Sequence, residues 1–353
     1  MKKIIITILT ITTLFACKND IEAPVVNTDF FESYYTDNIQ PSLANFTQEL
    51  KTQEALIQKF EASKNDADFD KMLSQWLVCA KAFSKIEVYN FGLIKDKFYN
   101  INLYNYPANI TKVESNIASK VIYDSNFFAS QSTSNKGLAT IEYLLYGNQN
   151  ITEAKSLLIN DNYRLDYLLG VSKELIRVSE AIKNTWKNEY KDTFINLNGN
   201  ICTQSAKCLS INQIINVLDV AKVTKIGKPA GFEKSNNIAP TTLQAYRSKT
   251  SLKLIEATLN EIKYAYFDSK TNYASLVDAI DDSKKISAEI AKKINNLELE
   301  ISKLNNNLFD EISDNTENVQ PIYNGLKELS ILFAVDVTSI LSVAVLPTDN
   351  DGD

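Results

Sequence analysis

The sequence contains no histidine among its 353 residues. Imidazole is the base of serine–histidine triads, the usual nitrogen ligand of zinc and a common axial ligand of haem. The absence of histidine therefore excludes these three kinds of site in their usual forms. Glycine and proline are also scarce, with nine and seven residues, which disfavours a sandwich or barrel of many short strands and favours long helices with few turns.

An excess of positive charge is also lacking. The formal net charge is −6 and the pI is about 5.1, whereas a nucleic-acid partner requires a basic face. We therefore expect no nucleic-acid binding. Hydrophobic residues make up 44% of the chain and charged residues 23%, as in a globular protein with a substantial core, and the length allows two domains.

Beyond the first residues, the sequence has no apolar run long enough to span a bilayer. The chain starts with a basic MKK, continues with an apolar run over residues 4–15 and ends this run in LFAC at Cys17. This pattern resembles the lipobox of bacterial lipoproteins, so residues 1–17 predict a signal peptide whose Cys17 receives lipid. Such an anchor would place the protein on a membrane of the cell envelope, at the outer membrane or in the periplasm. A plain secretory peptide with an incidental cysteine is the alternative.

The other cysteines fall into two groups. Cys202 and Cys208 lie close together in the polar segment CTQSAKC. In an oxidising compartment they can form a small disulfide loop, and the sequence leaves open whether they do. Cys79 lies in a helical pattern and is expected to be a small buried side chain.

Apolar residues recur at steps of three and four along most of the chain, which is the spacing of one face of an α-helix. The clearest stripes cover residues 69–87, 175–186, 252–266 and 286–312. The last of these predicts a single helix of about seven turns. A further helix is expected to continue, buried nearly all round, through Val345.

These stripes predict an all-α fold of two helical-bundle domains. Residues 18–28 are expected to be a polar tether, residues 29–197 the N-terminal domain and residues 205–345 the C-terminal bundle. Residues 346–353 form an acidic tail that we expect to be frayed. The tail resembles the first half of a calcium loop, but it lacks the acid that completes one.

Two glutamates occupy apolar stripes. Glu87 stands where the helical spacing of residues 69–87 predicts an apolar side chain. Glu142 lies in KGLATIEYLLYG, between Leu138 and Leu145 on the same helix face. Burying an unpaired carboxylate costs several kcal/mol, so each acid is expected to have a partner, a proton or a bound cation.

The segment around Glu142 resembles the signature of the imelysin family, the M75 peptidase-like group also called iron-regulated protein A-like. That signature is Gly-x-His-x-x-Glu, followed by an aromatic and leucine run and a glycine. Gly137, Glu142 and Gly147 match it in frame, whereas Ala139 stands where the family has histidine.

Other segments resemble the same family. Its tryptophan-bearing helix that ends in Glu-x-x-x-Phe-Gly is matched by Trp76 and by Glu87 with Phe91-Gly92. The loop Lys228-Pro-Ala-Gly231 and the segment YRSKTSL at residues 246–252 also look familial, so the resemblance covers nearly all of the mature chain.

The resemblance implies an all-helical envelope protein, often a lipoprotein, that is linked to iron or haem uptake. It places the site at Glu142, Glu87, Gly137, Ala139 and Trp76. The metallopeptidase interpretation of the family rests on the histidine and glutamate of the motif, and Ala139 supplies no ligand. Glu142 and Glu87 remain candidate ligands for iron or another divalent cation, haem is a further candidate ligand, and tyrosine phenolates are chemically allowed iron ligands.

Three functions are therefore open. The first is a non-catalytic accessory protein of iron or haem acquisition, which binds an ion, haem or an envelope uptake protein between the two helical units. The second is a peptidase of the M75 type, with Glu142 as a base in an apolar setting. The third is a helical scaffold or interaction lipoprotein in which Glu87 and Glu142 are paired core acids.

Overall fold

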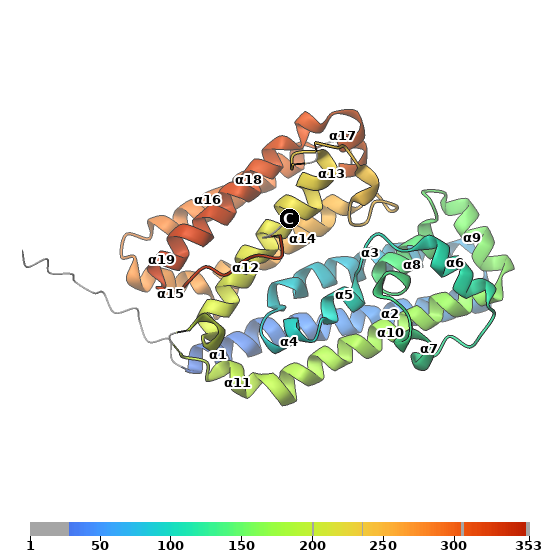
Figure 1. Cartoon of the computed structure of the whole chain (residues 1–353), viewed down its shortest axis with the longest axis horizontal. Helices are drawn as coiled ribbons and strands as arrows, with labels where there is room; N and C mark the ends of the chain where they lie inside the picture. The colour runs from blue at the N-terminus through green and yellow to red at the C-terminus, as the bar shows by residue number, and fades with distance from the viewer. Residues whose placement is uncertain (1–27, 200, 235, 305–306, 351–353) are drawn as a thin grey trace, which may run out of the picture.

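The computed structural model describes residues 28–199, 201–234, 236–304 and 307–350. The predicted signal peptide with Cys17, and all of the tether but Thr28, lie outside these ranges. The described residues form helices and no strand, which confirms the predicted all-α class. Figure 1 shows two groups of helices, α1–α11 and α12–α19, which we call the N-terminal half and the C-terminal half.

The N-terminal half is built on the long helices α2, α3 and α10: α2 packs against both α3 and α10, and α8 packs against α3 and α10. Its α-helices are α1 (Thr28–Tyr34), α2 (Gln40–Ser63), α3 (Asp66–Ile86), α4 (Leu93–Asp96), α5 (Tyr99–Leu103), α6 (Ile110–Ala118), α7 (Ser125–Ala129), α8 (Leu138–Tyr146), α9 (Ile151–Asn160), α10 (Asn162–Asn184) and α11 (Lys191–Ile195). Asn65 and Asp161 begin α3 and α10, because their side chains accept hydrogen bonds from the first exposed N–H groups.

The C-terminal half packs α12 and α16 against α18. Its α-helices are α12 (Ala206–Lys222), α13 (Lys228–Ala230), α14 (Ser251–Lys263), α15 (Tyr273–Ile280), α16 (Lys285–Lys303), α17 (Leu308–Asp314), α18 (Gln320–Ile331) and α19 (Thr338–Ile340). Apolar side chains of α16 at steps of three and four are buried, as the stripe predicts: Ile290, Ile294, Leu297 and Ile301.

Wider and tighter helical turns extend or connect these helices. The π-helical turns are η1 (Tyr35–Ile39), η4 (Thr185–Tyr190), η6 (Val223–Gly227), η8 (Tyr264–Asp268) and η10 (Leu332–Val337). The 3₁₀ turns are η2 (Glu87–Tyr89), η3 (Thr133–Asn135), η5 (Cys202–Gln204), η7 (Pro240–Thr242) and η9 (Thr316–Asn318).

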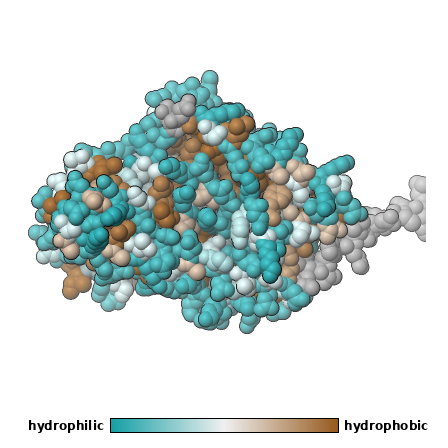
Figure 2. Space-filling view, turned by 180° about the vertical axis from the view of Figure 1, so that it is seen from behind, coloured by the Kyte–Doolittle hydropathy of each residue, from teal (hydrophilic) through white to brown (hydrophobic). Residues whose placement is uncertain are grey.

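The two halves share one hydrophobic core. Helix α14 packs along α3, and α12 packs against η2, so the ends of the long N-terminal helices meet the C-terminal bundle directly. Figure 2 shows that the rear face of the molecule is mainly hydrophilic, with hydrophobic side chains gathered in patches between polar ones. None of the helices in the described ranges has the length and apolar character to cross a membrane.

Two predicted helices are shorter than their apolar stripes. The stripe at residues 286–312 is divided, because α16 ends at Lys303 and α17 starts after Asn307, whose side chain caps the new helix by accepting a hydrogen bond from the Asp310 N–H. The last helix ends at Ile340, and Ser342 adopts a left-handed φ of +52° that turns the chain out of it. The predictions of one helix to Ile312 and of another to Val345 were therefore wrong.

The predicted frayed tail is bound along α12 as far as residue 350. We call residues 343–350 the C-terminal strap. The Leu346 N–H donates to Asn212 Oδ1 at 2.7 Å, and the Asp349 N–H donates to Asn216 Oδ1 at 2.8 Å. The Asp349 carboxylate also lies 2.8 Å from Lys95 Nζ of the N-terminal half. The strap is therefore ordered by polar side chains on one face of α12.

Cys202 and Cys208 form a disulfide in the structure, with their Cα atoms 5.1 Å apart. This loop lies at the start of α12, beside the strap, where Asn212 Nδ2 donates to the Ala344 carbonyl at 2.8 Å. Cys79 is a buried free thiol in α3.

Candidate functional site

Helix α8, which carries Glu142, is buried along its whole length. Gly137 precedes it with a φ of +91°, and a Cβ atom there would lie 2.7 Å from the Leu103 carbonyl oxygen, so this entry to the helix requires glycine. Trp76 of α3 donates its indole N–H to the Leu138 carbonyl at 2.9 Å. Trp76 has no exposed surface, so it fixes the start of α8 and presents no face to a ligand.

Glu142 joins the two halves of the molecule. Its Oε1 accepts hydrogen bonds from the Ser248 N–H at 2.8 Å and from the Ser248 hydroxyl at 2.9 Å. Burial raises the pKa of Glu142 to about 7, although the Ser248 hydrogen bonds and the Arg247 charge act in the opposite direction. The carboxyl group is therefore divided between its protonated and ionised forms near neutral pH.

The turn that carries Ser248 is constrained. Ala245 and Lys249 flank it with left-handed φ values of +61° and +56°, which side chains other than glycine rarely adopt. Between them, the guanidinium of Arg247 lies 4.3 Å from the ring centre of Tyr246 and 5.4 Å from that of Tyr143. These cation–π contacts hold a buried positive charge close to Glu142.

Several buried polar atoms at this junction have no hydrogen-bond partner among the described residues. On the C-terminal side they are both amide atoms of Gln244, Nε of Arg247 and Oγ of Ser251; on the N-terminal side they are the Tyr104 hydroxyl and Oγ1 of Thr140. Buried polar groups are normally paired, and an unpaired one destabilises the folded protein. The junction therefore holds polar atoms of both halves that would become available to a ligand if the halves separated locally.

Glu87 lies at a different point of the same junction. The chain leaves α3 at Ile86, so Glu87 starts the turn η2 and does not continue the helical stripe. Its Oε2 lies 2.7 Å from Lys225 Nζ of the C-terminal half. The lysine side chain is only 4% exposed and the glutamate side chain 20%, so Glu87 compensates a buried ammonium group.

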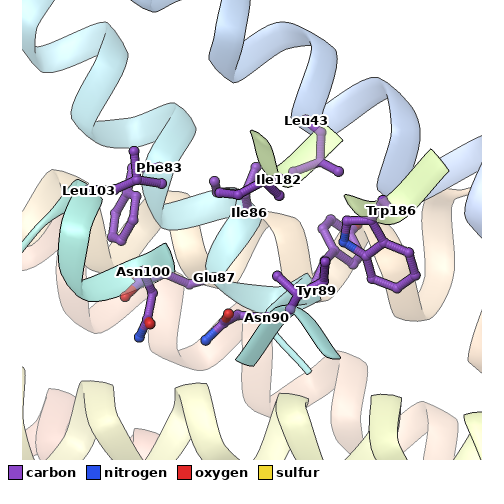
Figure 3. A pocket seen from close by; sticks show the side chains of 11 residues that line it. Leu43, Phe83, Ile86, Glu87, Tyr89, Asn90, Asn100, Leu103, Ile182 and Trp186 are labelled. Carbon is purple, nitrogen blue, oxygen red and sulfur yellow. The ribbon is translucent and has the colours of Figure 1, made fainter. Parts of the chain in front are cut away.

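Glu87 also borders a small cavity in the N-terminal half. The cavity has a volume of about 20 Å³, enough for one water molecule. Figure 3 shows its apolar wall, formed by residues such as Phe83, Leu103 and Trp186, with Asn90 and Asn100 beside Glu87 at its polar side. It is too small for haem or for a peptide.

Tyr104 connects the two acids electrostatically. Its pKa is raised, first by burial and then by the charges of Glu142, Tyr106 and Glu87. Its neutral phenol is therefore favoured, and this tyrosine is a poor phenolate ligand for iron in the protein as it stands.

The residues present do not fit a metal ion held jointly by Glu87 and Glu142. Glu142 accepts two hydrogen bonds from Ser248, and Glu87 has the ammonium group of Lys225 as its partner. Ala139 is buried in α8 at the position predicted to correspond to the family histidine. Across the described ranges, no three acidic or cysteine side chains are grouped so that they could hold a metal ion.

Sequence reasoning found Glu142, Glu87, Gly137 and Trp76 but did not assign their partners. Ser248 lies in the YRSKTSL segment that looked familial, which was the available signal for it. Lys225 and Tyr104 gave no pattern of their own, because their roles depend on contacts with residues distant in the sequence.

Comparison with known proteins gives a consistent result. The sequence model of the imelysin family, Peptidase_M75, matches residues 39–332. An imelysin-like protein from Psychrobacter arcticum 273-4 has a similar structure, with a TM-score of 0.76, 18% identity, and coverage of 91% of this chain and 98% of the other. An iron-regulated protein A-like precursor from Parabacteroides distasonis ATCC 8503 gives a TM-score of 0.66, 17% identity, and coverage of 87% and 95%. No curated protein matches the sequence significantly.

Proposed function

Because the chain belongs to the imelysin family, we propose that it is a non-catalytic binding protein of the cell envelope that assists iron or haem acquisition. The similarity in fold to an iron-regulated protein A-like precursor supports the link to iron. A lipid on Cys17 would hold the protein at the membrane surface, where an uptake protein would be its partner.

The observation that supports this proposal best is the set of contacts that Glu142 makes. The signature acid is kept, but Ala139 supplies no second ligand, and the carboxylate binds Ser248 across the junction of the two halves. Around it lie polar atoms without partners, on Gln244 and Ser251 and on Tyr104. Such a set of groups can recognise a ligand by hydrogen bonding.

We therefore expect recognition of the polar part of an iron-carrying compound or of haem, such as its carboxylates, rather than direct ligation of iron by Glu87 and Glu142. Arg247 supplies a buried positive charge, and Gln244 and Ser251 supply donors. Ligand entry would require the two halves to separate locally, because Glu142 is only 2% exposed.

The test is a titration of the mature protein with haem, ferric citrate and divalent metal salts. Trp76, which is hydrogen-bonded to the start of α8, is a built-in fluorescent reporter of the site, and the unfolding temperature is an independent readout. We expect haem or ferric citrate to change both, and Glu142→Gln to weaken that response. Glu61→Gln, an exposed change on α2, is the matched control. If the compounds change neither readout, the binding proposal fails.

A peptidase of the M75 type is the second candidate, and the raised pKa of Glu142 favours it because a base that titrates near 7 suits proton transfer. Hydrolysis of a peptide library that is abolished by Glu142→Gln, but not by Glu61→Gln, would support this activity. A scaffold function remains the third candidate, supported by the pairing of Glu87 with Lys225. A scaffold function predicts that Glu142→Gln changes the stability of the protein but does not change ligand binding.

A further inference from the structure

A larger recess lies between the start of α2 and the end of α14. We call it the α2–α14 groove. Its volume is about 490 Å³, which is within the range of small-molecule sites. It is lined from the N-terminal half by Asp37, Asn38, Pro41, Ser42, Asn45 and Lys85, and from the C-terminal half by Asn260, Glu261, Lys263, Tyr264 and Asp268. None of the residues of the Glu142 junction is among them.

Glu261 is the buried acid of this groove. Its side chain is 4% exposed, and its Oε1 accepts hydrogen bonds at 2.7 Å from the Ser42 hydroxyl and from the Tyr89 hydroxyl. The other oxygen, Oε2, has Lys85 Nζ at 3.7 Å, which is within ion-pair range but too long for a hydrogen bond. These two hydrogen bonds orient the carboxylate, and Oε2 can accept a hydrogen bond from a ligand.

Asn38 is a buried polar residue of the groove wall. It is 1% exposed and lines the groove. Its Nδ2 donates to the Thr271 carbonyl at 3.0 Å, which fixes the orientation of the amide, and its Oδ1 has no donor among the described residues. Asn38 Oδ1 is itself buried, so a ligand in the groove would reach it only after a local shift of the wall.

The groove is flanked by two π-helical turns that contact each other. Asn38 and Asp37 belong to η1, whereas Tyr264 and Asp268 belong to η8. The Tyr264 hydroxyl donates to the Asp37 carbonyl at 3.3 Å, and the Thr271 hydroxyl donates to the Asp37 carboxylate at 2.7 Å. π-Helical turns widen a helix locally and are frequent at functional sites. Here both turns lie at the same recess.

The charges on the wall define the class of ligand. Three carboxylates, those of Asp37, Glu261 and Asp268, face two ammonium groups. One of these, Lys263, lies 2.9 Å from Glu298 and is thereby compensated. The wall therefore offers mainly acceptors and negative charge, and Tyr264 adds an aromatic ring, which attracts cations.

We propose that the α2–α14 groove binds a small organic cation that carries N–H donors, a primary ammonium or a guanidinium compound. The cation donates to Glu261 Oε2, and Asp268 contributes attraction at the exposed edge. Lys85 already places an ammonium group near Glu261. It therefore competes with the ligand for the same carboxylate.

Because Lys85 competes with the ligand, the proposal predicts one variant with weaker binding and one with stronger binding. Calorimetric titration of the full mature chain with putrescine and agmatine measures binding, and tetramethylammonium is the probe that has the charge without N–H donors. We expect Glu261→Gln to weaken binding about tenfold or more, because a hydrogen bond to a charged acceptor is lost. Lys85→Met is expected to strengthen binding about threefold, since it removes the competing charge.

Two further variants make the test independent of folding defects at Glu261. Asp268→Asn, at an exposed position, is expected to weaken binding about threefold, whereas Asp70→Asn, an exposed change on α3 away from the groove, leaves it unchanged. Absence of binding by both amines at millimolar concentration overturns the proposal. Equal binding of tetramethylammonium, equal effects of Asp268→Asn and Asp70→Asn, or weaker binding by Lys85→Met overturns it as well.

Discussion

The ionisation of Glu142 should make the stability of the protein depend on pH in a specific way. The folded protein holds the proton of Glu142 up to about pH 7, whereas the unfolded chain releases it at the ordinary value of 4.5. Between these values the folded state binds more protons than the unfolded state, so the free energy of unfolding falls as the pH rises. The full difference corresponds to about 3 kcal/mol, which is lost above both pKa values.

Glu142→Gln removes this loss. Glutamine is neutral at every pH and has the shape of the protonated glutamic acid, and its carbonyl oxygen can accept the same hydrogen bonds from Ser248. At about pH 5 we expect the variant and the wild type to differ by no more than about 1 kcal/mol. At about pH 8 the variant should be the more stable protein. The free energy of unfolding of the variant minus that of the wild type should be about 2–3 kcal/mol higher at pH 8 than at pH 5.

Urea unfolding followed by tryptophan fluorescence at the two pH values measures these differences. Glu61→Gln is the control for the loss of an exposed carboxylate, and its effect should be small at both pH values. A pH-independent effect of Glu142→Gln would refute the reasoning. It would mean that Glu142 is ionised throughout and that Arg247 and Ser248 fully compensate its burial.

Three further predictions concern the residues that hold the junction. Gly137→Ala should destabilise the protein by about 2 kcal/mol or more in urea unfolding, because the new Cβ meets the Leu103 carbonyl at a positive φ; Gly325→Ala, which meets only the flexible Leu297 side chain, should cost less. Glu87→Gln should lower the free energy of unfolding by about 3 kcal/mol, because it leaves the buried Lys225 ammonium group without a counter-charge. Adding Lys225→Met to this variant should recover much of the loss. If the losses of the two single variants simply add in the double variant, Glu87 and Lys225 are not coupled. Trp76→Phe should lower the free energy of unfolding by about 2 kcal/mol, since the Leu138 carbonyl loses its buried donor, and a neutral effect would show that this hydrogen bond does not secure α8.

Much of the fold followed from periodicity, because long amphipathic helices leave regular apolar stripes. The boundaries followed less well. The apolar spacing over residues 286–312 is uninterrupted, so it predicts one helix. Only the preference of Asn307 for the start of a helix indicates that there are two. The strap was missed for a related reason: its binding depends on Asn212 and Asn216, whose spacing is helical but whose polar character gives no hydrophobic signal.

The sequence allowed candidate residues of the site to be named one by one, but it did not predict which residues they contact. Glu142 and Glu87 stood out as acids on apolar stripes. No sequence pattern pairs Ser248 with one and Lys225 with the other, because each pair is separated by more than a hundred residues. Glu261 was overlooked although Ala257, Thr258 and Ala265 surround it at helical spacing. Ala257 and Thr258 lie on α14, which packs against α3, and small side chains at this spacing indicate that an acid among them is buried.

The C-terminal strap links the two halves, and its amide hydrogens report which end of that link is the weaker one. The N–H groups of Leu346 and Asp349 are held by side chains of α12, and the same strap is tied to Lys95 of the other half. If the halves move apart, the strap must release either α12 or Lys95. Hydrogen exchange at these two amides therefore distinguishes the two cases, because they become exposed when the strap leaves α12 and stay protected when only the contact with Lys95 breaks.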